Sequence, residues 1–208
     1  MTGVQTCALP IYQHSHHSYR QIRGVVGGIT AAERAEIIDL GLRHRGCHDE
    51  VARTFNSGQK FRFDILMDIG GFRDMHRHRR CVQVLEDYTT LHGFDRPDDI
   101  DRAGLADRYD TAMARARETS TALAVRPAAE ASENSHYLIP LAYRKRGLFK
   151  MDFAEALYIS ELRSGPAGHF SYRNVAYAMY EAVAQRYPDL AKYFRVTDVR
   201  QPVDLLKR

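Results

Sequence analysis

One stretch, Phe61–Tyr88, limits what this chain can fold into, because the spacing of its apolar residues changes halfway along it. Apolar and charged residues alternate over Phe61–Asp68, the two-residue period of a strand with one buried face. Gly70 and Gly71 then interrupt the pattern. Beyond them the apolar positions fit a helical stripe better than a strand: Phe72, Met75, Val82 and Leu85. The sequence therefore predicts a strand that leads directly into a helix.

The predicted helix carries the densest group of basic and titratable residues in the chain: Arg73, His76, Arg77, His78, Arg79 and Arg80. Like charges at this spacing repel, so the cluster is most stable where an anion or facing carboxylates balance it. Acidic residues lie close in sequence, at Asp68, Asp74, Glu86 and Asp87. Two interpretations stay open, an anion site and a solvated, salt-bridged helix face, and charge alone favours the second.

Residues Phe61–Arg79 resemble the strand-to-helix segment of flavin-dependent thymidylate synthases, which carry an Arg-His-Arg signature after a Phe-x-Phe strand. The resemblance continues at Tyr137–Pro140 and over Met151–Arg163, so it covers most of the chain from about Phe61 onward. It agrees with the fold class that the predicted elements give. That class is α+β, dominated by helices and with a small antiparallel sheet.

The resemblance implies reductive methylation of dUMP to dTMP, with FAD as the cofactor and NADPH and methylenetetrahydrofolate as cosubstrates. In such a reaction the protein supplies positioning and anion stabilisation, so no protein nucleophile and no metal are expected. Arginine suits this role because a guanidinium binds phosphate bidentately and stays charged. The family builds its sites between subunits of a homotetramer, so the resemblance also implies a homo-oligomer.

Five residues match functional positions of the family. Arg77, His78 and Arg79 match the signature triplet, which implies cofactor binding. Arg73 matches an arginine one turn earlier, and Arg163 matches a late arginine that grips the nucleotide. Both imply substrate binding.

His169 and Arg173 follow Arg163 closely and are further candidates for substrate binding. His169 stands at a predicted helix start, and Arg173 lies one turn on, on the same face. A capping histidine with a surface arginine is the alternative interpretation.

Other family positions have changed. The family glutamine before the triplet is Asp74, and the Glu, Ser and Arg after it are Leu85, Asp87 and Thr89. The late Asn-x-Arg is Asp152 and Ala154, and a further Asn is Tyr158. A carboxylate near a phosphate is unfavourable unless an arginine neutralises it. These changes keep a second hypothesis open, a non-catalytic structural or regulatory domain that keeps the fold.

The segment Met1–Ile11 resembles the translation of a sequencing adapter, so we set it aside and expect a fragment of a longer protein. Residues 12–208 are predicted to form a single domain. The chain has a second Arg-His-Arg, Arg43–Arg45, which follows a helix that begins at Thr30. Cations are favourable at a helix C-terminus, so this triplet is assigned to helix capping.

Periodicity and turn residues predict the remaining elements. They predict helices over Asp101–Ala124, Met151–Leu162 and His169–Tyr187, a turn or short strand at Val25–Ile29, a short strand at Tyr137–Tyr143, a connector at Val125–Asn134 and a short strand in the tail Val196–Arg208.

Composition excludes several classes of protein. No apolar run approaches the ~20 residues of a membrane span. The three cysteines form no CxxC pair, which argues against zinc and disulfide frameworks and favours a reducing, cytoplasmic compartment. The net charge of +4 is concentrated in one cluster with acids beside it, so nucleic-acid binding is not expected.

Overall fold

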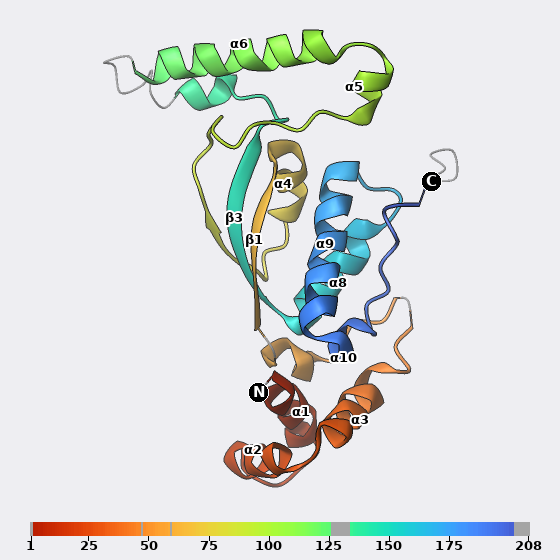
Figure 1. Ribbon diagram of the computed structural model, residues 1–208. Helices are drawn as coiled ribbons and strands as arrows, with labels where there is room; N and C mark the ends of the chain where they lie inside the picture. The colour runs from red at the N-terminus through yellow and green to blue at the C-terminus, as the bar shows by residue number, and fades with distance from the viewer. Residues whose placement is uncertain (1, 47, 59, 126–133, 202–208) are drawn as a thin grey trace. The chain divides into compact units, whose positions relative to one another are not determined.

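The computed structural model describes residues 2–46, 48–58, 60–125 and 134–201 (Figure 1). The fold is α+β, with a small antiparallel sheet among many helices, as predicted. The chain forms two compact units and passes between them four times. The first unit comprises Met1–Phe63, His78–Val82 and Phe149–Arg208, and the second comprises Asp64–Arg77 and Gln83–Leu148. That residues 12–208 form one domain stays a prediction.

The sheet has three strands in the order β1–β3–β2. Strand β1 (Lys60–Asp68) is the predicted strand, and its side chains alternate as expected, with Phe61, Ile65 and Met67 buried. Strand β3 (Arg144–Asp152) lies beside β1 (Figure 1) and was not predicted. Its inward positions include Lys145 and Gly147, so the sequence shows little apolar alternation there.

The helix after β1 is shorter than predicted. Helix α4 (Ile69–Met75) begins at Asp68, whose Oδ1 accepts a hydrogen bond from the Gly71 amide at 2.8 Å. It ends before the triplet. The Gln83 side chain contacts His76 twice: its Nε2 donates to the His76 carbonyl at 3.4 Å, and its Oε1 lies 2.8 Å from His76 Nδ1. These two contacts favour a turn after His76.

The prediction of a helix through Val82 and Leu85 is therefore wrong, because Val82–Leu85 forms strand β2. The triplet Arg77–Arg79 lies in the turn between α4 and β2 rather than on a helix.

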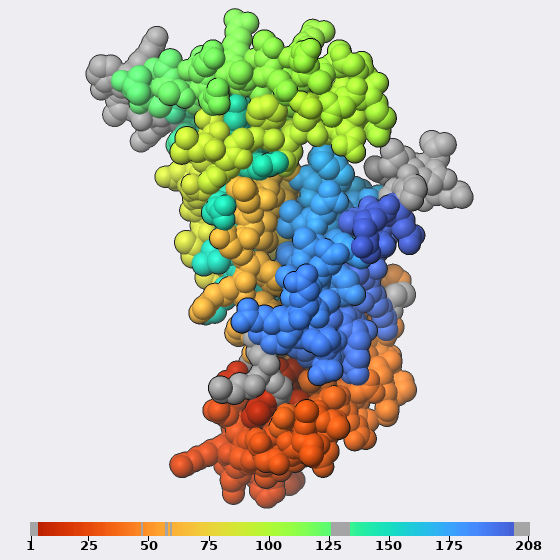
Figure 2. Space-filling model, viewed as in Figure 1, coloured from red at the N-terminus to blue at the C-terminus, as the bar shows by residue number. Residues whose placement is uncertain are grey.

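Helices dominate the first unit: α1 (Thr2–Gln13), α2 (Tyr19–Gly28), α3 (Ala31–Leu42), α8 (Phe153–Ser164), α9 (Phe170–Arg186) and α10 (Pro188–Ala191), with a 3₁₀ turn η1 (Arg53–Ser57). Helices α8 and α9 pack against each other and, with α10, form the continuous blue block of Figure 2. Both helices contribute buried apolar side chains, among them Phe153 and Leu157 of α8 and Met179 and Val183 of α9. The helices predicted at Met151–Leu162 and His169–Tyr187 are confirmed, with shifted ends.

The N-terminal region differs from the prediction in one respect. Val25–Ile29 was predicted as a turn or strand, but Val25–Gly28 completes helix α2, which the Ser18–Gln21 capping box starts. The helix predicted to begin at Thr30 is α3, and a capping box of Thr30 and Glu33 is present at its start. The segment Met1–Ile11 lies largely in α1, where Cys7 is fully buried. Its origin as an adapter translation stays a prediction.

The second unit contains α5 (Asp98–Arg102), α6 (Ala106–Ala124) and the 3₁₀ turn η2 (Ser135–Leu138), together with α4. The single helix predicted over Asp101–Ala124 is two helices, because Gly104 adopts a φ of +69° that interrupts them. The strand predicted at Tyr137–Tyr143 is instead η2 and a loop, in which Tyr143 forms one isolated bridge with Phe94.

Two predicted segments lie partly outside the described residues. Of the connector Val125–Asn134, residues 126–133 are not described, and of the tail, residues 202–208 are not described. The described part of the tail, 196–201, contains no strand. Within the described part of the chain, no helix has the length and apolar character needed to cross a membrane.

Candidate functional site: a buried histidine and the arginines around it

The two units divide the predicted site residues between them. Arg73 and Arg77 belong to the second unit, and the others belong to the first: His78, Arg79, Arg163, His169 and Arg173. Within the first unit, the side chains of two predicted residues are hydrogen-bonded to each other.

That pair is His78 and Arg163, which are 85 residues apart in sequence. Arg163 lies in the last turn of α8, and its Nε donates a hydrogen bond of 3.0 Å to His78 Nε2. On the other side of the ring, His78 Nδ1 lies 3.5 Å from Glu155 Oε1, and both side chains are 5% exposed. A guanidinium can only donate, so His78 Nε2 must accept. The proton of the neutral imidazole is therefore on Nδ1, facing the Glu155 carboxylate.

An aromatic ring covers the Arg163 guanidinium. Arg163 Cζ lies 5.4 Å from the centroid of the Tyr172 ring, within the range of a cation–π interaction. Tyr172 can adopt this position because Gly168 has no side chain. A Cβ on Gly168 would lie 2.5 Å from Tyr172 Cε2, so the ring would have to move.

Arg80, which the sequence analysis did not assign, neutralises the acidic side of the site. Its Nη2 donates to both carboxylate oxygens of Asp152, at 3.0 and 2.9 Å, and its Nε lies 3.4 Å from Glu155 Oε2. Asp152 Oδ1 also accepts from the Glu155 amide at 2.9 Å and so caps α8. The carboxylate that replaces a family asparagine is therefore paired with an arginine, the one condition under which the sequence analysis considered it tolerable.

Glu155 was not predicted from the sequence either. Its only sequence signal was its place three residues after Asp152, the spacing of a helix start. Nothing local in the sequence pairs it with His78, which is 77 residues away. That pairing comes from the packing of α8 beside the turn that carries the triplet.

Cys81 follows the cluster directly and is not a candidate nucleophile. The side chain is 8% exposed, and burial, with the negative charges of Glu155 and Asp152, raises its pKa to about 12. A thiol with so high a pKa carries almost no thiolate at neutral pH, and the thiolate is the reactive form.

The capping interpretation explains His169, but the surface interpretation of Arg173 is wrong. His169 is the N-cap of α9, where its Nδ1 accepts from the Ser171 amide at 3.4 Å. Arg173 is only 7% exposed, and its Nε donates to the Ser164 carbonyl at 3.0 Å. Its Nη2 is buried without a hydrogen-bond partner among the described residues. A role for either residue in substrate binding stays a prediction.

Four arginines of the cluster are exposed: Arg73, Arg77, Arg79 and Arg80. Arg77 is paired only loosely with Asp74, since Nη1 lies 3.9 Å from Oδ1 and the Arg77 side chain is 69% exposed. Exposed pairs of this kind contribute little to stability, which leaves such a guanidinium able to exchange its partner for an anion.

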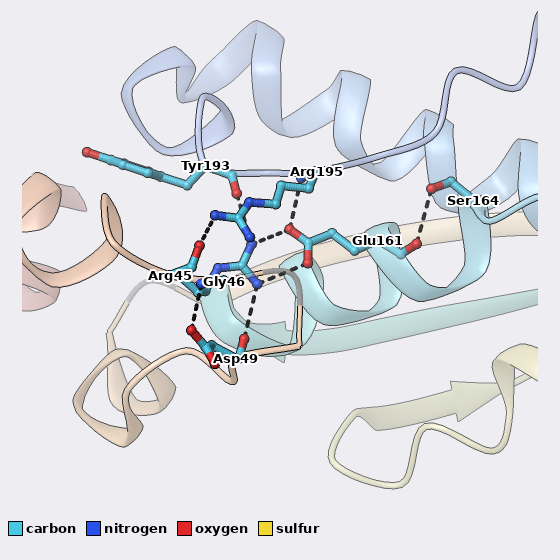
Figure 3. A network of polar contacts seen from close by, with 7 residues as sticks. All are labelled: Arg45, Gly46, Asp49, Glu161, Ser164, Tyr193 and Arg195. Carbon is cyan, nitrogen blue, oxygen red and sulfur yellow. Dashed lines mark hydrogen bonds and ion pairs between the residues drawn. The ribbon is translucent and has the colours of Figure 1, made fainter.

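The second Arg-His-Arg has a structural role that capping only partly describes (Figure 3). Arg43 is the C-cap residue of α3, as expected, but Arg45 reaches α8. Its guanidinium binds both carboxylate oxygens of Glu161, and Nη2 also donates to the Tyr193 carbonyl at 3.1 Å. The Arg195 amide donates to the same carboxylate at 2.8 Å. This network joins three segments of the first unit.

Among the described residues, no group of three or more His, Cys, Asp or Glu side chains could hold a metal ion. The site that the first unit does contain is a buried histidine held between a carboxylate and an arginine.

Comparison with known proteins assigns this chain to a family. The family model described as thymidylate synthase complementing protein matches residues 11–189, a range that includes all the predicted site residues. The UPF0159 protein of Chlamydia pneumoniae is 34% identical over 139 residues, or 67% of this chain and 25% of the relative.

Two further relatives match over a larger part of the chain. The UPF0159 protein of Chlamydia muridarum is 28% identical over 191 residues, or 92% of this chain and 35% of the relative. That of Thermoplasma acidophilum is 32% identical over 180 residues, or 84% and 35%. The chain thus spans between 25% and 35% of the length of these relatives. By the extent of the family match, this chain belongs to the thymidylate synthase complementing proteins, the flavin-dependent thymidylate synthase family.

Proposed function

We propose that this chain binds FAD and a dUMP-like nucleotide and serves the reductive methylation of dUMP to dTMP, with NADPH and methylenetetrahydrofolate as cosubstrates. The observation that carries the proposal is the contact of Arg163 with His78. It joins the two separated segments on which the family resemblance depends, within one compact unit. Family membership over residues 11–189 supports the same function.

The donor set suits a diphosphate cofactor. Arg77 and Arg79 are exposed arginines two positions apart in sequence, and guanidinium forks bind phosphate bidentately. When bound, FAD would supply the hydride that the methylation needs. The nearby carboxylates of Asp152 and Glu155 interact with Arg80, so their charge opposes an approaching phosphate less strongly.

We assign the nucleotide to the arginines of α8 and α9 in the first unit; a contribution from Arg73, which belongs to the second unit, stays an expectation of the family resemblance. Arg163 is partly exposed and rigidly held, which suits a fork that grips a phosphate or a pyrimidine edge. His169 and Arg173 would add an anion contact beside it, since a buried guanidinium without a carboxylate partner favours a nearby negative charge. This part of the proposal also expects a homo-oligomer, by analogy with the homotetramers of the family.

A second candidate function is a non-catalytic domain that keeps the fold, and one observation favours it. Asp152, which stands for a flavin-contacting asparagine, is the N-cap of α8 and forms ion pairs with Arg80 and, at 3.9 Å, with Lys60. Leu85 and Thr89 also lack the groups that the family uses at these positions. The two functions differ in whether the chain takes up flavin.

The test is a titration of the purified chain with FAD, followed by absorbance and calorimetry. Bound flavin that is lost in Arg77→Ala and Arg79→Ala supports the enzyme function and justifies an assay of dTMP formation. Arg43→Ala is the matched control, because Arg43 is an exposed arginine of the other triplet. A well-folded chain that takes up no FAD at micromolar concentration contradicts the proposal and favours the non-catalytic domain.

A further inference from the structure

The Arg163 guanidinium is held in place by groups from two other segments of the first unit. His78 accepts from its Nε, and the Tyr172 ring covers its face. We infer that His78 is a positioning residue, which fixes the orientation of Arg163 for the nucleotide and is not itself a ligand of the cofactor. This inference deepens the proposed function and rests on it, because it changes the role expected of one residue of the signature triplet.

The first reason is that both ring nitrogens of His78 face protein groups. Nε2 accepts from Arg163 at 3.0 Å, and Nδ1 lies 3.5 Å from Glu155 Oε1. An imidazole has no other polar atoms. A flavin could hydrogen-bond this ring only by displacing one of the two partners, and the side chain is 5% exposed.

The second reason is the geometry of a guanidinium held through Nε. Its planar fork has a second edge, formed by the two terminal nitrogens, and that edge is the one suited to bidentate recognition. With Nε held by His78 and the ring of Tyr172 on one face, the rotation of the fork is restricted before a ligand arrives. Restriction in the free protein lowers the entropy lost on binding.

The third reason is that the histidine is itself fixed in one tautomer. The Glu155 carboxylate favours the proton on Nδ1, which leaves the Nε2 lone pair for Arg163. Arg80 in turn holds Glu155, with Nε 3.4 Å from Oε2. Each contact in this series pairs a donor with an acceptor: Arg80 faces the Glu155 carboxylate, His78 Nδ1–H faces the same carboxylate, and Arg163 Nε donates to His78 Nε2. All four residues lie within the first unit.

The experiment compares two replacements of His78 in the full chain. In His78→Gln the side-chain amide can still accept from Arg163 and donate to Glu155, whereas His78→Leu can do neither. The matched control is His44→Leu, the exposed histidine of the other triplet. Affinities for dUMP and for FAD are measured separately by calorimetry, and melting temperatures check that each variant folds.

We expect His78→Leu to lower dUMP affinity about 10-fold, the size of one hydrogen bond to a charged group. FAD affinity should stay within about 2-fold, since the exposed arginines that bind it are unchanged. His78→Gln should keep dUMP affinity within about 3-fold of the unchanged chain, because it keeps the acceptor for Arg163. Loss of FAD affinity with dUMP affinity kept, or equal losses of dUMP affinity in the two variants, overturns the inference.

A ligand-free measurement separates this inference from the proposed function. Nitrogen-15 NMR reports the His78 tautomer and the solvent exchange of the Arg163 Nε–H. An Nδ1–H tautomer and a protected Nε–H in the unchanged chain and in His78→Gln, with protection lost in His78→Leu, support positioning even if neither ligand binds. In that case only the proposed function fails. An Nε2–H tautomer, or an unprotected Nε–H in the unchanged chain, overturns the inference whatever the ligands do.

Discussion

Replacing Arg45 by Met should destabilise the first unit strongly, although Arg45 belongs to a triplet that looks like surface capping in the sequence. The Arg45 side chain is 7% exposed and that of Glu161 is 17% exposed. Met keeps most of the aliphatic stem but removes every donor that Arg45 supplies to Glu161 and to the Tyr193 carbonyl. Glu161 would keep the Arg195 amide, so its carboxylate would be only partly satisfied.

The magnitude follows from that remaining contact. Removing one partner of a buried ion pair costs about 3–5 kcal/mol, and the remaining amide and partial exposure of Glu161 place this pair at the lower end. We therefore expect a loss of about 3 kcal/mol in the free energy of unfolding. For a chain of this length that corresponds to a fall of roughly 6–12 °C in melting temperature.

The assay is urea unfolding of the full chain, with a double-mutant cycle. Arg45→Met, Glu161→Leu and the double variant are compared, and the double variant should lose at least about 1.5 kcal/mol less than the two single losses added together. Arg43→Met is the control, with an expected loss below about 0.5 kcal/mol because its pair with Asp39 is exposed. A loss below about 1 kcal/mol in Arg45→Met, or simple additivity, would refute the buried network.

Three further predictions concern the candidate site. Gly168→Ala should move the Tyr172 ring and weaken dUMP binding about 3-fold, measured by calorimetry beside Gly24→Ala, whose added Cβ meets nothing within 4 Å. Cys81 should resist alkylation at pH 8 in the folded chain and react in urea, as detected by mass spectrometry, because burial and nearby acids raise its pKa to about 12. Because the pKa of the Cys81 thiol is higher in the folded chain than in the unfolded chain, the contribution of this group to stability is complete below about pH 9, the unfolded value, and is lost as pH rises towards 12. Cys81→Ala should therefore make the decrease in unfolding free energy at alkaline pH shallower. Arg80→Met should lower the melting temperature by several degrees, since Asp152 and Glu155 would both lose an arginine, and Asp152→Asn should relieve part of that loss in the double variant.

The sequence predicted the elements whose patterns are local. Strand β1 follows strict alternation, and α3 begins at a capping box, so neither depends on distant residues. Strand β3 could not be predicted in this way, because its inward Lys145 reads as a surface residue. In the second unit the Lys145 ammonium lies 3.9 Å from the centroid of the Tyr88 ring and donates to the Glu86 carbonyl. Burial lowers the pKa of Lys145, and the aromatic face and carbonyl offset the cost of that burial.

Strand β2 shows the opposite error. Phe72, Met75, Val82 and Leu85 fit a helical stripe, yet Val82 and Leu85 are exposed strand residues. The apolar positions fitted the period of a helix although two of them belong to a strand. The turn between α4 and β2 depends on the hydrogen bonds of the Gln83 side chain with His76. Hydrophobic spacing could not reveal that bond.

The candidate site was predictable only in part, for a similar reason. The resemblance identified His78 and Arg163, but Glu155, which pairs with His78 and with Arg80, lies more than 70 positions from both of them in sequence. Residue type alone did not assign roles either. The two Arg-His-Arg triplets have the same residues but differ in burial at the second and third positions. His78 is buried while His44 is exposed, and the Arg45 side chain is 7% exposed while Arg79 is exposed.

In each triplet, the side chain with the lowest exposure is the one that pairs with a carboxylate of helix α8. This helix offers one carboxylate to each triplet, Glu155 to His78 and Glu161 to Arg45. The two acids are six positions apart, which places them about 120° apart around a helix, so the triplets reach α8 on different faces. Arg163 lies two residues beyond Glu161, at the end of a helix that is fixed on both sides. The position of the proposed nucleotide-binding arginine therefore depends on both triplets, although only one of them carries the family signature.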